Sequence, residues 1–127
     1  MIYQKQSRKT VEQAAQDLAT SISAHGFGLL HSYDFRQILG SKGFQLDNEC
    51  RVLEVCNPKQ ASEVLAMNMA LNLVLPCRIS VYQDGGATII AMVPPSDLLV
   101  LVSDDPRVRS AALEVETSMR EIIDAAA

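Results

Sequence analysis

Hydrophobic and polar positions repeat along this chain with two periods, one typical of strands and one of helices. The first segment, residues 2–6, is predicted to be a strand. Thr10 and Gln13 then have the spacing of a capping box, which predicts that a helix begins after Thr10. Gly26 supplies the left-handed residue that often ends a helix. The apolar face of this helix is predicted to hold Val11, Ala15, Leu18 and Ile22.

The period changes to two at Phe27, which predicts a second strand running to Asp34. A short helical turn over residues 35–39 and a third strand over residues 50–56 follow. Asn57 can cap the next helix and Pro58 suits its first position, where no backbone donor is lost. One face of the second strand is predicted to carry Phe27, Leu29, His31 and Tyr33. The buried stripe of the helix that begins at Pro58 is predicted to consist of Ala61, Val64, Leu65 and Met69.

The sequence pattern in the second half of the chain predicts a hairpin and two helices. A strand is expected over residues 73–82, with Pro76 at an edge or bulge. Asp84-Gly85-Gly86 is a strong turn signal that leads into a strand over residues 87–93. Ser96 is expected to cap a short helix that ends at Leu101. The last helix begins at Asp105-Pro106, and its buried positions are predicted to be Val108, Ala112, Val115, Met119 and Ile122.

These elements predict an α+β fold: a mostly antiparallel sheet of about five strands, with helices packed on one face. We expect residues 1–127 to form a single domain. Because the helices cover only one face of the sheet, the other face needs a cover. A second copy of the chain is the simplest one, since symmetric homodimers are the commonest soluble oligomers.

Composition narrows the classes of partner. The chain has 127 residues, of which 48% are hydrophobic, enough for one core without metals or disulfides. Its net charge of -4 gives no attraction to nucleic acid or to anionic membranes. Its apolar runs are too short to cross a bilayer, and its start lacks the pattern of a secretory signal. The three cysteines make an odd count, which is typical of reduced thiols in the cytoplasm.

Three segments carry a resemblance to a known family: Gly26–Leu30 followed by Asp34, Leu53–Pro58 followed by Ala61, and Leu75–Tyr82. Together they resemble the bacterial and archaeal family called domain of unknown function 302. The pairing of Cys-Asn-Pro with a later Leu-Pro-Cys is the most specific part. The resemblance implies a small α+β domain of the strand, helix, four strands, helix type, usually a homodimer, with no established activity.

Two cysteines are candidates for chemistry. Cys56 and Cys77 lie at a strand end and near a strand start, so the fold can bring them together as a thiol pair. Cys77 belongs to the apolar set of its strand, which predicts a buried and inert thiol. Cys56 precedes the helix capped by Asn57, whose dipole favours a thiolate, and we expect it to be the more reactive of the two.

Charged and imidazole side chains offer a second group of candidates. Glu54 and Arg78 each interrupt an apolar strand, and they either pair across the sheet or face solvent. Alternatively Arg78 binds an anionic ligand near the helix N-terminus at Asn57. His31 is either a hydrogen-bonded strand residue or a haem ligand, with a methionine of residues 67–69 as the second group.

Three hypotheses about function follow. The first is a non-catalytic dimeric ligand-binding or accessory module, its small-molecule site drawn from Cys56, Asn57, Arg78, Glu54 and His31. The second is a haem-binding or thiol redox protein. The third, an enzyme, ranks last because no acid, base and nucleophile form a recognisable set. The sequence also has no pattern typical of a metal site.

Overall fold

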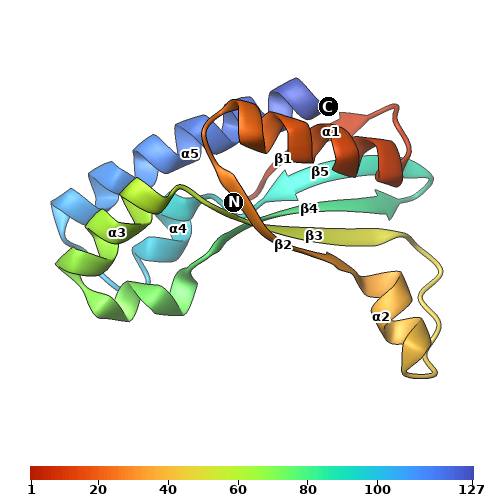
Figure 1. The fold of residues 1–127 in the computed structure, drawn as a ribbon, viewed down its shortest axis with the longest axis horizontal. Helices are drawn as coiled ribbons and strands as arrows, with labels where there is room; N and C mark the ends of the chain where they lie inside the picture. Colours follow the sequence, from red (N-terminus) through yellow and green to blue (C-terminus); the bar gives the residue numbers. More distant parts are fainter.

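Residues 1–127 are described by a computed structural model, in which five strands form one antiparallel sheet (Figure 1). The order across the sheet is β1-β5-β4-β3-β2. This arrangement confirms the predicted α+β class. The strands are β1 (Tyr3–Ser7), β2 (Gly28–Asp34), β3 (Cys50–Cys56), β4 (Cys77–Asp84) and β5 (Ala87–Met92).

Helices α1 and α5 lie side by side over one face of the sheet (Figure 1). The main core is formed where they meet the strands, and Leu18, Ile79 and Ile122 are fully buried in it. A smaller core joins α3, η1 and α4 to the first half of α5 through Val64 and Leu71. The helices are α1 (Val11–Ala24), α2 (Phe35–Ser41), α3 (Pro58–Met67), the 3-10 helix η1 (Met69–Val74), α4 (Pro95–Leu99) and α5 (Pro106–Ala126).

Three of the predicted helix starts are confirmed. The Thr10 hydroxyl accepts a hydrogen bond from the Gln13 backbone N–H at 3.1 Å. The Asn57 side chain likewise accepts from the Gln60 N–H at 3.2 Å, and Asp105 accepts from the Arg107 N–H at 2.9 Å. Such caps satisfy backbone donors that the first turn of a helix leaves free, so they fix where each helix begins.

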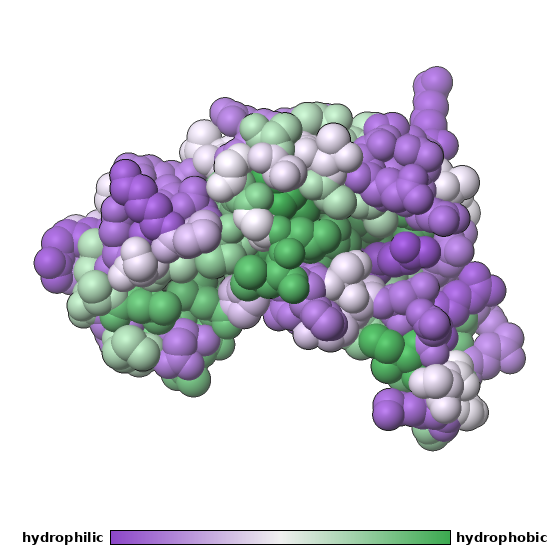
Figure 2. All heavy atoms as spheres, viewed as in Figure 1, coloured by the Kyte–Doolittle hydropathy of each residue, from purple (hydrophilic) through white to green (hydrophobic).

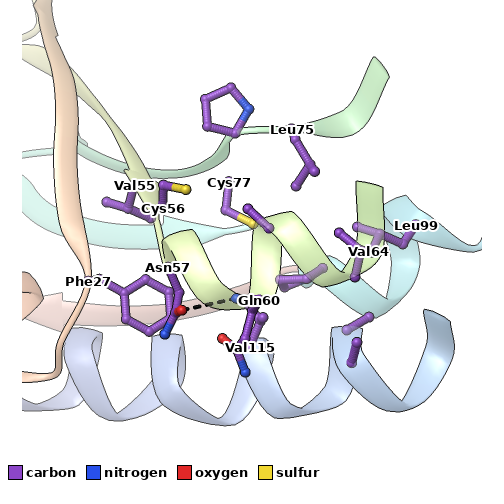
Figure 3. A pocket seen from close by; sticks show the side chains of 15 residues that line it. Phe27, Val55, Cys56, Asn57, Gln60, Val64, Leu75, Cys77, Leu99 and Val115 are labelled. Carbon is purple, nitrogen blue, oxygen red and sulfur yellow. Dashed lines mark hydrogen bonds between the residues drawn. The ribbon is translucent and has the colours of Figure 1, made fainter. Parts of the chain in front are cut away.

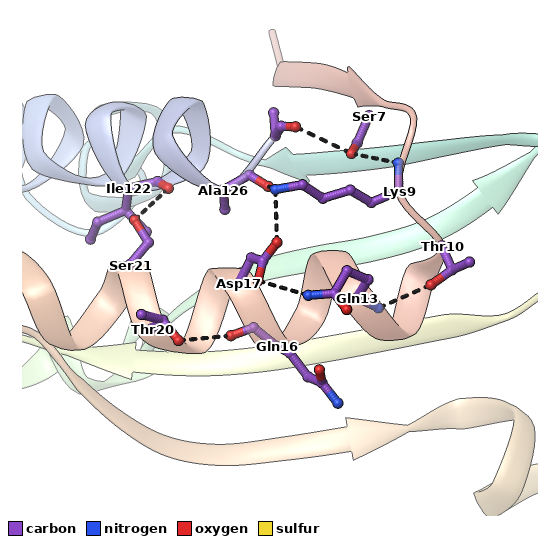
Figure 4. Close-up of polar contacts among 11 residues, drawn as sticks. Ser7, Lys9, Thr10, Gln13, Gln16, Asp17, Thr20, Ser21, Ile122 and Ala126 are labelled. Atoms are coloured by element: carbon purple, nitrogen blue, oxygen red, sulfur yellow. Dashed lines mark hydrogen bonds and ion pairs between the residues drawn. The ribbon is translucent and has the colours of Figure 1, made fainter.

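Polar contacts fasten the end of α5 to α1 and the chain before it (Figure 4). The Ser21 hydroxyl in α1 donates to the Ile122 carbonyl oxygen at 2.8 Å. The Lys9 ammonium group donates to the Ala126 carbonyl oxygen at 2.8 Å and also pairs with Asp17 at 2.8 Å. These bonds tie the two helices that cover the sheet to each other.

A β-bulge in β2 changes which face its side chains reach. Leu29 is opposite Val55 on β3, but His31 is opposite Glu54, so Leu30 is an extra residue. An extra residue in one strand shifts the alternation by one position. The prediction that Phe27, Leu29, His31 and Tyr33 share a face was therefore wrong: Phe27 packs in the main core, whereas His31 and Tyr33 lie on the other face.

The strand predicted from residue 73 begins only at Cys77. Asn68 ends α3, and its side chain accepts from the Ala70 N–H at 3.0 Å, which starts η1 instead. Leu71 then fills the smaller core while Met69 and Leu73 stay exposed. The predicted buried stripe of α3 is thus wrong at Met69, because the helix ends before that residue.

The predicted cap of α4 is also different. The Ser96 hydroxyl does not cap the helix and instead donates to the buried Glu116 carboxylate in α5 at 2.5 Å. Glu116 also accepts from the Ser96 N–H at 3.3 Å. A charged acceptor forms a stronger hydrogen bond than a neutral one, so the contact between the two helices prevails over the local cap.

The second face of the sheet is left uncovered by α1 and α5. In the view of Figure 1, α2 projects beyond the ends of β2 and β3, and none of its residues is buried. The surface is hollowed between α2 and the η1–α4 end of the molecule (Figure 2). No helix of the protein has the length and apolar character that crossing a membrane requires.

Candidate functional site

An apolar cleft lies where β3 ends, β4 begins, and α3 packs near α5 (Figure 3). It contains about 440 Å³ of empty space, part of which is open to solvent. Eleven of its fifteen lining residues are hydrophobic, and none carries a charge. Binding sites for small molecules are typically concave and mostly apolar, with a few polar groups that orient the ligand. The apolar walls include Phe27, Val55, Val64, Leu75, Leu99 and Val115.

The amide groups of Asn57 and Gln60 are two of the four non-hydrophobic groups in the cleft. Asn57 is used as the cap of α3, and Figure 3 shows its bond to the Gln60 backbone. The Gln60 side-chain oxygen, Oε1, is buried and has no hydrogen-bond partner. An unpaired buried acceptor costs about 1–3 kcal/mol, and most buried polar groups are paired.

The thiols of Cys56 and Cys77 also line the cleft. Cys77 is opposite Val55, the residue before Cys56, so the two cysteines lie on neighbouring strands one position apart in register. Both thiols are free. Burial, and to a smaller extent the charge of the Cys56 thiolate, raise the pKa of Cys77 to about 11.

Burial also raises the pKa of the Cys56 thiol. From the sequence, the N-terminus of α3 is expected to favour the Cys56 thiolate. That expectation is not met, because desolvation in the cleft disfavours the charged thiolate and raises this pKa. Cys56 remains the less buried thiol of the pair, and its greater reactivity stays a prediction.

A separate polar group lies on the uncovered face of the sheet. Glu54 and Arg78 are direct neighbours in the β3–β4 register, but no ion pair forms between them. Glu54 instead accepts a hydrogen bond from the Tyr33 hydroxyl at 2.7 Å, which raises the pKa of Tyr33. Arg78 is exposed, and together with Tyr33, Glu54, Phe35 and Val52 it lines a shallow second pocket.

The structure thus divides the five candidate residues into two groups. Cys56 and Asn57 line the apolar cleft, whereas Glu54 and Arg78 line the pocket on the uncovered face. His31 belongs with the second group, because it is exposed and its ring contacts the Tyr33 ring at a tilt of 52°, with the ring centres 4.5 Å apart. The expected site joining Arg78 to the α3 N-terminus is not assembled, since Arg78 does not line the cleft.

The candidate haem ligands do not share a pocket. His31 is on β2, Met67 ends α3, and Met69 begins η1. None of the three side chains lines the apolar cleft or the pocket around Arg78.

Two residues of these sites were missed by the sequence analysis. Gln60 is not among the candidate residues of the sequence, because nothing local indicates that its side chain would be buried against α5. Tyr33 was expected on the same strand face as Phe27, because a one-residue bulge leaves little trace in a strand of mixed polarity. The signal that pointed to the cleft was the Asn57-Pro58 helix start.

Comparisons with other proteins agree with the fold. The sequence model of the family described as "Domain of unknown function DUF302" matches residues 3–126. A solved structure described as an uncharacterized conserved protein DUF302 from Bacillus stearothermophilus is 29% identical. It superposes with a TM-score of 0.93, over 99% of this chain and 98% of that one. Among curated proteins none matches the chain. The match along almost the whole length shows that this chain belongs to the DUF302 family.

Proposed function

We propose that the protein is a non-catalytic module that binds a small molecule in the apolar cleft. The observation that carries this proposal is the unpaired Gln60 Oε1 beside walls that are mostly apolar. A fully apolar core would gain stability without that amide, so its presence in the wall points to a ligand that pairs with it. The three free cysteines fit a reducing compartment such as the cytoplasm.

The chemistry of the cleft defines the ligand class. Its walls favour an uncharged, largely apolar body, because they offer no charged partner. The Gln60 oxygen calls for one hydrogen-bond donor on that body, such as a hydroxyl or an amide N–H. The terminal torsion of a glutamine side chain is broad, so a small rotation can turn Oε1 toward a ligand in the cleft.

Phenol and toluene test this proposal because they have nearly the same shape and only phenol has a donor. Binding is measured by NMR titration of the wild type and of Gln60→Met, which keeps the side-chain length but removes the amide. We expect the substitution to weaken phenol binding by roughly tenfold, the effect of one lost hydrogen bond to a buried group. Toluene binding should change little. Equal losses for both compounds, or no binding of either compound, would contradict the proposal.

We also propose that the uncovered sheet face forms a homodimer. Its central row runs across the sheet through Tyr33, Val52, Ser80 and Ala91. Val52 and Ala91 are buried even without a cover, so this row is closely packed. Beside it α2 projects with no buried residue of its own, although it carries apolar side chains. A short helix held this way gains packing partners when a second copy lies against the same face.

The oligomeric state of the wild type and of Ser80→Arg tests the dimer. Ser80 lies between Val52 and Ala91, so a large charged side chain there opposes close contact between two such faces. Light scattering should give twice the chain mass of 13.9 kDa for the wild type and the single mass for Ser80→Arg. The matched control is Ser62→Arg on the exposed side of α3, which should remain dimeric. A wild type that stays monomeric at all concentrations would show that this face is not an interface.

A further inference from the structure

The two cysteines of the cleft form a pair that the proposed function does not use. β3 ends at Cys56 and β4 begins at Cys77, and the strands are direct neighbours. Figure 3 shows both side chains at the wall of the cleft, where the strand end and the strand start meet. Both residues line the same cleft, and Cys56 is one of the groups that raise the pKa of Cys77.

The surroundings restrict what two such thiols can bind. The lining contains no carboxylate and no imidazole, so a hard cation that prefers oxygen ligands finds no partner. Nowhere in the protein do three or more His, Cys, Asp or Glu side chains gather as metal ligands. A four-coordinate zinc site therefore lacks ligands. Two thiolates in an apolar setting suit a soft ion that accepts low coordination, and thiolate ligands select copper(I) among the biological metals.

We propose that Cys56 and Cys77 together bind one copper(I) ion as a two-coordinate bis-thiolate complex. Two S–H bonds break and two metal–sulfur bonds form, so each bound ion releases two protons to solvent, and no electron is transferred. The complex carries one negative charge, and Cys56 is next to the N-terminus of α3, whose partial positive charge favours an anion. This inference goes beyond the proposed function, because it needs no organic ligand.

The test uses the reduced full chain without oxygen. Copper(I), supplied as its acetonitrile complex, is titrated in competition with a coloured copper(I) chelator. The variants are Cys56→Ser and Cys77→Ser, and Cys50→Ser is the matched control because Cys50 is a free thiol that does not line the cleft. We expect one ion per wild-type chain, tighter binding as the pH rises, and an unchanged affinity in Cys50→Ser.

Either cleft substitution should weaken copper binding by more than about 100-fold, beyond the loss that a supporting contact outside the ligand set causes. Cys77→Ala serves as a second variant, and circular dichroism checks that each variant is folded. X-ray absorption of the wild-type complex should show two sulfur neighbours. The proposal is overturned if Cys77→Ser and Cys77→Ala bind as tightly as the wild type, if Cys50→Ser is equally impaired, or if no copper binds. Phenol titration of the same samples measures the proposed function separately.

Discussion

Replacing Gln60 by methionine should make the unliganded protein more stable, which is unusual for a change at a binding site. The substitution removes a buried acceptor that has no partner, and it keeps the length of the side chain. The unpaired acceptor costs about 1–3 kcal/mol, and Gln and Met have nearly equal helix propensity. The substitution also removes the amide nitrogen and its contact with water. We therefore take the lower end of this range, about 1 kcal/mol, as the expected gain in stability. For a chain of 127 residues that raises Tm by about 4 °C.

Thermal and urea unfolding followed by circular dichroism measure this effect. Gln16→Met is the matched control: Gln16 is exposed on α1, so the same exchange should change stability by less than about 0.5 kcal/mol. A Gln60→Met variant that is no more stable than the wild type would refute the reasoning. It would mean that the amide is already satisfied in the unliganded protein, and the cleft would lose its main polar signal.

Three further predictions concern stability and thiol reactivity. Asn57→Ala should cost about 1 kcal/mol of unfolding free energy and Asn57→Gly less, because the Asn57 side chain satisfies a backbone donor of α3; chemical denaturation measures both. A thiol reagent followed by peptide mass mapping should modify Cys56 before Cys77, whose burial raises its pKa to about 11; equal rates would contradict this ranking. The hydrogen bond from Lys9 lowers the pKa of Asp17, so its contribution to stability is present above the ordinary value of 3.8 and is lost as the pH falls through the lowered value. Asp17→Asn should flatten the dependence of Tm on pH in that acidic range. An unchanged slope would show that the pair of Lys9 and Asp17 does not contribute to stability.

Local signals in the sequence were enough to predict the order of the strands and the main helices along the chain. Asn57 and Asp105 each combine a capping side chain with a following proline, and both helices begin there. Gly85 and Gly86 both adopt positive φ in the predicted hairpin turn. These features depend on neighbours in the chain, which is why a single sequence reveals them.

Features that depend on distant partners were not predicted. Ser96 stands where a helix cap is expected, but its hydroxyl donates to the Glu116 carboxylate, which is twenty residues away in α5. The extra residue at Leu30 moved His31 and Tyr33 to the uncovered face, and no local pattern marks it.

The candidate site shows the same division. Cys56 and Asn57 were found from the helix start, and both line the cleft. Gln60 was missed, because its burial depends on the packing of α3 against α5. For Arg78 the sequence left open a place beside Glu54, a place in solvent or a role at the α3 N-terminus, and the structure puts it exposed beside Glu54 on the uncovered face.

Methyl-resolved NMR of the wild-type protein during a phenol titration tests the central claim most directly. If the cleft is the binding site, the shifted signals should belong to the methyl groups of Val55, Val64 and Val115, which line it from β3, α3 and α5. Val52, on the uncovered face of the sheet, should be unaffected. Shifts confined to Val52 and its neighbours, or no shift up to the solubility of phenol, would contradict the account of the cleft as the ligand site.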